Sequence, residues 1–152
     1  MNPEIIDTSI SLELAVADLY LHFHKVFPQD SDFWWKMSLE EKGHAAILRS
    51  ARDSFMPVDK FPAEIIMKSH NKIKKTLSFI IEKIEHLKDN PISRKEAFEL
   101  SVHIENTSGE LHYQEFMTSI KDNEVNSIFK RLNGDDKDHA QRIEKYMKEQ
   151  GI

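Results

Sequence analysis

The sequence contains no cysteine, which excludes disulfides, thiolate zinc sites, thiolate iron centres and cysteine catalysis. Any bound metal ion must therefore have nitrogen and oxygen ligands. Glycine and proline are also scarce, with four and five residues among 152, whereas 31% of the residues are charged. This composition favours long helices over loops and sheet, and the length suits a single domain, residues 1–152, with a full hydrophobic core.

The sequence also lacks long apolar runs and a strong excess of one charge. No segment reaches the length of a membrane span, and the N-terminus has no basic segment followed by an apolar one. We therefore expect no membrane partner and a cytoplasmic protein. The net charge is −5 with both signs interspersed, which gives no reason to expect a nucleic-acid partner. The basic residues between Lys68 and Lys75 are expected to form a solvated helix face.

Apolar residues recur with a period of 3.6, which predicts an all-α fold. The expected helices cover residues 9–26, 31–55, 62–88, 93–120 and 123–149. Prolines end the first two helices, at Phe27-Pro28 and Met56-Pro57. Asp30 or Ser31 is the expected N-cap of the second helix, and Ser93 with Glu96 has the spacing of a capping box at the start of the fourth.

Two acidic residues are each followed by a histidine three positions later, as Glu41–His44 and Asp136–His139. Both pairs lie on the apolar face of their helices. The spacing alone is common by chance in so acidic a chain, so each pair is weak evidence when taken singly. Their significance depends on what else faces the same part of the core.

Two further glutamates stand alone in apolar helical stripes, Glu13 in the first helix and Glu105 in the fourth. In a pair of antiparallel hairpins, both glutamates and both acid–histidine pairs fall within about one helical turn of a common level. Four buried carboxylates at one depth need a cation, because an unpaired buried charge is costly. The set is that of a two-metal site in a helical bundle. A polar structural core held by hydrogen bonds is the alternative.

Three other polar residues are expected beside this set. Tyr20, His24 and His112 lie on the inward faces of the first and fourth helices. We expect Tyr20 to donate a hydrogen bond to a ligand carboxylate. His24 and His112 are expected to lie beside the ligands or in the core rather than to bind metal, and no catalytic residue is predicted beyond the metal ligands.

The segments 13–20, 32–44, 95–105 and 136–139 resemble the rubrerythrin branch of the ferritin-like superfamily, and the resemblance covers nearly the whole chain. It implies an antiparallel four-helix bundle with an additional crossover helix between helices two and four. It also implies two non-haem iron ions and chemistry on peroxide or dioxygen. Carboxylate and imidazole ligands suit manganese as well as iron, and zinc could also occupy the site. The implied ligands are two bridging glutamates, two terminal carboxylates and one histidine per metal, respectively Glu41 and Glu105, Glu13 and Asp136, and His44 and His139.

The chain departs from the rubrerythrin pattern at two positions and in its domain content. Asp136 stands where these proteins usually have glutamate, and its side chain reaches about 1.3 Å less far, against metal–ligand distances that tolerate only about 0.2 Å. Ser108 stands where a further glutamate is usual. A cysteine-bearing rubredoxin domain is absent, so turnover would require an external electron donor.

The sequence leaves alternative functions and the assembly open. Besides a peroxidase or ferroxidase, the chain could be an iron-binding or storage protein without turnover, or a non-catalytic helical module that acts through protein contacts. A homodimer is compatible with the resemblance, although no surface residue argues for one.

Overall fold

The computed structural model describes residues 4–55, 63–107 and 138–152. These residues form α1 (Glu4–Val26), the 3-10 helix η1 (Pro28–Asp30), α2 (Ser31–Phe55), α3 (Ala63–Asp89) and α4 (Arg94–Thr107). A C-terminal helix follows over residues 138–150. No strand occurs in the described ranges, which confirms that this part of the protein is all-α.

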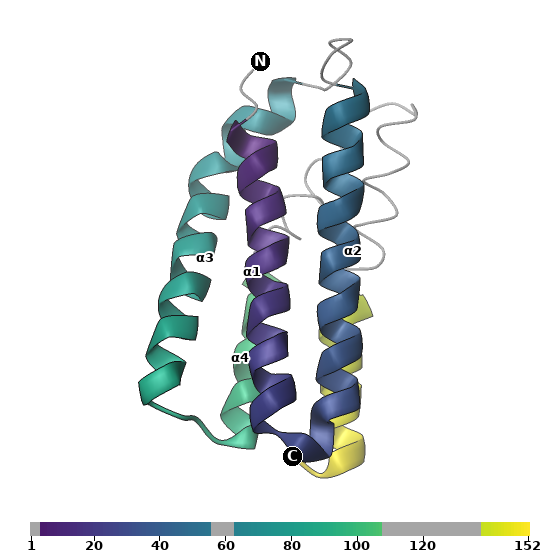
Figure 1. The fold of residues 1–152 in the computed structure, drawn as a ribbon, viewed down its shortest axis with the longest axis vertical. Coiled ribbons are helices and arrows are strands. Elements are labelled where there is room, and N and C mark those ends of the chain that lie inside the picture. Colours follow the sequence, from purple (N-terminus) through teal and green to yellow (C-terminus); the bar gives the residue numbers. More distant parts are fainter. Residues whose placement is uncertain (1–3, 56–62, 108–137) are drawn as a thin grey trace.

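The described helices all run along one long axis (Figure 1). α1 packs mainly against α2 and α3, and α1 and α2 form an antiparallel hairpin (Figure 1). α3 carries the chain back along the bundle, so α2 and α4 point in the same direction (Figure 1). The C-terminal helix runs beside the first half of α2 (Figure 1). All five of these helices can therefore contribute side chains to one interior.

Several predicted helix boundaries agree closely with the structure. α2 and α3 match their predicted ranges within one residue, whereas α1 begins at Glu4, earlier than the predicted start at Ser9. The capping box is confirmed, because the Glu96 backbone N–H donates to Ser93 Oγ over 3.2 Å and the Ser93 N–H donates to Glu96 Oε2 over 2.7 Å. The predicted extension of the fourth helix to residue 120, and the start of the fifth, lie outside the described residues.

The predicted cap of α2 is wrong, because Asp30 and Ser31 bond elsewhere. Asp30 is buried in η1, where its carboxylate accepts hydrogen bonds from Arg94 over 2.6 and 2.7 Å and from Tyr146 over 3.0 Å. The Ser31 hydroxyl lies 2.8 Å from His24 Nδ1. α2 instead continues directly from η1. Asp30 therefore connects η1, α4 and the C-terminal helix at one end of the bundle.

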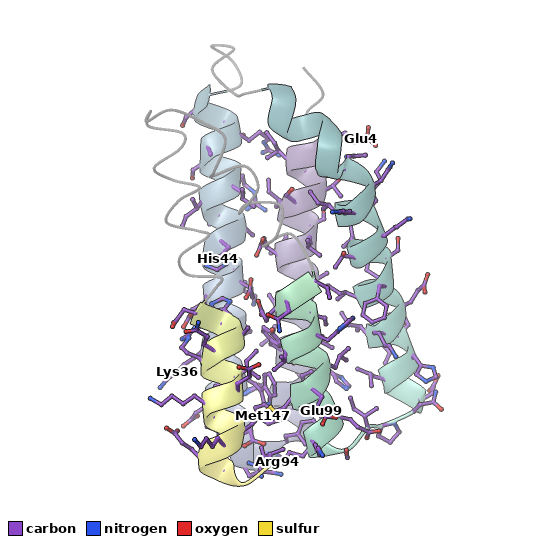
Figure 2. The ribbon with its side chains drawn as sticks, turned by 180° about the vertical axis from the view of Figure 1, so that it is seen from behind. Glu4, Lys36, His44, Arg94, Glu99 and Met147 are labelled. Atoms are coloured by element: carbon purple, nitrogen blue, oxygen red, sulfur yellow. The ribbon has the colours of Figure 1, made fainter. Side chains whose placement is uncertain are left out.

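Aromatic residues fill the core at this same end. Trp34 is fully buried between Tyr20 and Phe98, with ring centroids 5.4 and 4.4 Å away, and Phe33 stacks on Tyr146 at 4.1 Å. Polar side chains replace this aromatic core further along the bundle. Figure 2 places His44 about halfway along the axis, close to where the C-terminal helix begins.

None of the helices in the described ranges carries an apolar stretch long enough to span a bilayer.

Candidate metal centre

Five of the six predicted metal ligands lie within the described residues, and all five are buried. The exposed fractions are 8% for Glu13, 3% for Glu41, 5% for His44, 4% for Glu105 and 0% for His139. They come from α1, α2, α4 and the C-terminal helix. Each sits in an otherwise apolar helical face, as the periodicity predicts, so packing of these faces carries the polar groups into the interior.

Glu41 lies between the two histidines. Its Oε2 is 3.3 Å from His44 Nδ1, and its Oε1 is 2.8 Å from His139 Nδ1. The two imidazole rings are stacked, with centroids 5.2 Å apart and planes inclined by 20°. The Nδ1 atoms of both rings thus face the Glu41 carboxylate, and each of its two oxygens lies close to one ring.

The other two carboxylates flank this group. Glu13 Oε2 is 3.6 Å from His44 Nδ1, and Glu105 Oε2 is 3.7 Å from His139 Nδ1. The Tyr20 hydroxyl donates a hydrogen bond to Glu105 Oε1. Each imidazole is therefore near two carboxylates, one of which is shared.

The contact between Glu41 and His139 is close but is not a hydrogen bond. Neither Glu41 Oε1 nor His139 Nδ1 has a hydrogen-bond partner among the described residues, although the two atoms are 2.8 Å apart. Buried polar atoms almost always have such a partner, and a bound ion can take its place. Trp34 Nε1, His70 Nδ1 and Arg142 Nε are in the same state, so this observation adds to the geometry of the cluster but does not by itself identify a metal site.

The Glu41 carboxylate and the imidazoles lie so close together that each shifts the pKa of the other. Burial alone would lower the pKa of His44, but Glu13 and Glu41 outweigh it and raise the pKa to about 11. Burial opposes protonation of His139 as well, and the neighbouring Glu105, Glu40 and Glu41 raise its pKa well above the ordinary value. Conversely, burial would raise the pKa of Glu41, yet the two imidazoles bring it far below its usual range. Without metal, the imidazoles carry protons at neutral pH.

Comparisons with protein families, with curated proteins and with solved structures found no match to this chain. Function must therefore be inferred from the geometry of the site and from the motifs of the sequence.

The sequence did not predict one contact of the site, which joins Glu40 to His139. Glu40 Oε2 accepts a hydrogen bond from His139 Nε2 over 2.9 Å, on the side of the ring away from Glu41. The guanidinium of Arg142 donates two hydrogen bonds to the Glu40 carboxylate. The helical periodicity turns Glu40 away from the core line of Glu41, so the pattern gave no reason to choose it. Only its adjacency to Glu41 could have suggested it.

Of the remaining predicted residues, only His24 is described, and it lies away from the cluster. His24 lies near the α1–α2 connection, where its ring nitrogen is 3.0 Å from the Ser31 carbonyl oxygen and its ring is 5.4 Å from that of Trp35. It is eleven residues beyond Glu13 in α1, about 16 Å along the axis. The structure thus does not place His24 beside the ligands. Asp136 and His112 lie outside the described residues.

The cluster has the dimensions of a metal site. One ligand atom from each of Glu41, His44 and His139 can be chosen so that all lie within 4.8 Å of one another. Two ligands of a single ion, each at about 2.1 Å, are separated by at most about 4.2 Å. The observed spread therefore suits one ion after a small side-chain movement.

Proposed function

We propose that the protein is a ferritin-like di-iron carboxylate protein of the rubrerythrin type, in which manganese or zinc can replace iron. Its fold would be an antiparallel four-helix bundle with α3 as the crossover helix. The single observation that carries the proposal is the position of Glu41, with one oxygen directed to each of two buried imidazoles. With this arrangement, the carboxylate could bind two metal ions at once, one through each oxygen.

The residues present suit two divalent cations. Glu13, Glu41 and His44 would hold one ion, and Glu41, Glu105 and His139 the other, with Asp136 added by its position in the sequence. Oxygen and imidazole ligands suit Fe(II), Mn(II) and Zn(II). The buried carboxylates favour cations, because a low-dielectric interior strengthens charge pairing and penalises unpaired charge.

The proposed activity is reduction of peroxide, or oxidation of Fe(II) by peroxide or dioxygen. Bound iron would supply the two electrons that convert a peroxide and two protons to water, and an external donor would restore them. The chain itself would position the ions through Glu41, and Tyr20 would orient Glu105 through its hydrogen bond. Burial of the cluster would limit access of water.

Anaerobic titration with Fe(II), followed by addition of peroxide, tests this function. We expect about two Fe(II) per chain, as in helical-bundle sites with this ligand set, and oxidation of both on addition of peroxide. Replacing Glu41 and Glu105 together with glutamine should abolish binding while conserving side-chain volume. Glu99→Gln is the matched control, because Glu99 is exposed in α4 and pairs only weakly with Lys95, at 3.6 Å.

The same titration distinguishes this function from iron storage and from a non-catalytic helical module. Binding of iron without oxidation by peroxide, together with a large closed assembly in sedimentation, would favour storage. Absence of metal from both the natural chain and the double variant would contradict the proposal and leave a helical module with a polar core.

A further inference from the structure

His139 is held on both sides of its ring. Its Nδ1 faces Glu41 and Glu105 in the interior, while its Nε2 donates to Glu40 on the outer side of α2. The ring is completely buried, whereas the Glu40 side chain is 39% exposed. Glu40 is thus a link between a buried imidazole and the protein surface.

Glu40 is itself fixed in place. Arg142 donates to both of its carboxylate oxygens, one of them over 3.0 Å, and this paired geometry restricts the orientation of the carboxylate. Arg142 Nε also lies 2.9 Å from Asp138 Oδ2, one turn earlier in the same helix. His139 and Arg142 both belong to the C-terminal helix, so Glu40 of α2 connects to that helix at two points.

The Glu40 carboxylate acts as an acceptor in this contact. Both of its oxygens accept from the Arg142 guanidinium, which has donors only and pairs with an ionised carboxylate. An ionised carboxylate has no proton to donate, so the proton of this hydrogen bond is on Nε2.

We propose that Glu40 is the positioning residue of His139: it keeps the proton on Nε2 and the ring oriented so that Nδ1 presents its lone pair to the metal. This inference rests on the proposed metal-binding function. A neutral imidazole has one N–H and one lone pair, and the acceptor beside one nitrogen decides which nitrogen is free to bind. Without Glu40, a ring that has lost one proton could keep the other on Nδ1, beside Glu41 and Glu105, where it would compete with the metal.

The expected effect is confined to one of the two ions. Glu40→Ala should lower the affinity for the ion at His139 by about 10- to 100-fold, the usual effect of removing a residue that orients a ligand. The ion at His44 should bind as before. Glu40→Gln keeps an acceptor oxygen for the Nε2 proton and should recover part of the affinity. Glu99→Ala removes an exposed carboxylate elsewhere and should change neither ion.

Titration of the full chain with Co(II), followed by its absorption spectrum, tests the inference. The natural chain and all three variants are compared, with denaturation midpoints measured to confirm that each is folded. A second readout is the ¹⁵N resonances of the His139 ring in the Zn(II)-loaded protein, which should show a protonated Nε2 and a metal-bound Nδ1 in the natural chain. A residue that only stabilises the fold would shift the midpoint and leave the ring resonances unchanged.

Equal affinity of Glu40→Ala and the natural chain, with unchanged ring resonances, would overturn the role of Glu40 and leave the metal-binding proposal intact. Failure of the natural chain to bind Co(II) or Zn(II) would overturn both proposals.

Discussion

At the scale of single residues, the site depends on carboxylates that are each shared between partners. Glu41 serves both imidazoles, and Glu105 interacts with His139 and Tyr20. The loss of any one member should destabilise such a network. A buried polar group left without its partner lowers the unfolding free energy by more than the hydrogen bond had contributed.

Tyr20→Phe isolates one of these bonds. The substitution removes the hydroxyl that donates to Glu105 and keeps the ring that packs against Trp34. We expect the metal-free protein to lose about 1.5–3 kcal/mol of unfolding free energy, because the acceptor is a buried carboxylate. Urea denaturation measures it. Tyr146→Phe is the comparison: it removes the hydroxyl that donates to Asp30, but Asp30 keeps its two bonds to Arg94, so the loss should be smaller. An unchanged midpoint for Tyr20→Phe would contradict the hydrogen bond.

Metal binding should release protons at neutral pH. The pKa of His44 is raised to about 11, and that of His139 is also well above 6.5, so both rings are protonated in the metal-free protein. Binding requires an unprotonated Nδ1, so about two protons should leave per two metal ions, and affinity should fall as pH falls. Calorimetric titration with Zn(II) in buffers of different ionisation enthalpy counts these protons. Zero release at pH 7 would contradict the raised pKa values.

The same shift affects the stability of the metal-free protein. The folded-state pKa of His44 lies above its ordinary value of 6.5. Its contribution to stability is therefore fully present below about pH 6.5 and is lost as pH rises toward about 11.

At the scale of the elements, local chemistry was enough to predict most helix boundaries. Proline after Phe27 and the Ser93–Glu96 box act within a few residues, so their effects can be inferred without a structure. Asp30 could not be inferred in this way. Its partners Arg94 and Tyr146 are 64 and 116 residues away in sequence, and these contacts outweigh its local capping propensity.

Ser93→Ala tests the element scale directly. It removes the oxygen that accepts from the Glu96 N–H at the start of α4. We expect a loss of about 1 kcal/mol in unfolding free energy, typical of a lost N-cap. Ser50→Ala, at an exposed position in α2, is the control and should leave stability within about 0.5 kcal/mol, as is usual for such surface changes. An unchanged value for Ser93→Ala would show that α4 does not need its cap.

At the scale of the whole molecule, the sequence predicted the inward faces but not every contact between helices. Burial of Glu13, Glu41, His44 and Glu105 follows from 3.6-residue periodicity, which is a property of each helix alone. The bond from His139 to Glu40 depends on the rotation of the C-terminal helix against α2, which no local pattern specifies.

Because the proposed ions connect several helices, metal should stabilise the whole fold. At a free concentration 100 times the Kd, one bound ion adds about 2.7 kcal/mol. For a chain of this length the midpoint should rise by at least about 5 °C. Thermal unfolding with Zn(II) and after chelation measures this shift, which should disappear in the Glu41→Gln, Glu105→Gln double variant. Equal midpoints with and without metal would contradict binding within the folded core.

The most direct measurement is anomalous scattering at the iron edge from crystals grown anaerobically with Fe(II). The account predicts two iron peaks per chain on either side of the Glu41 carboxylate, one about 2.1 Å from His44 Nδ1 and the other at a similar distance from His139 Nδ1. Iron peaks only at the protein surface, or none at all, would contradict it.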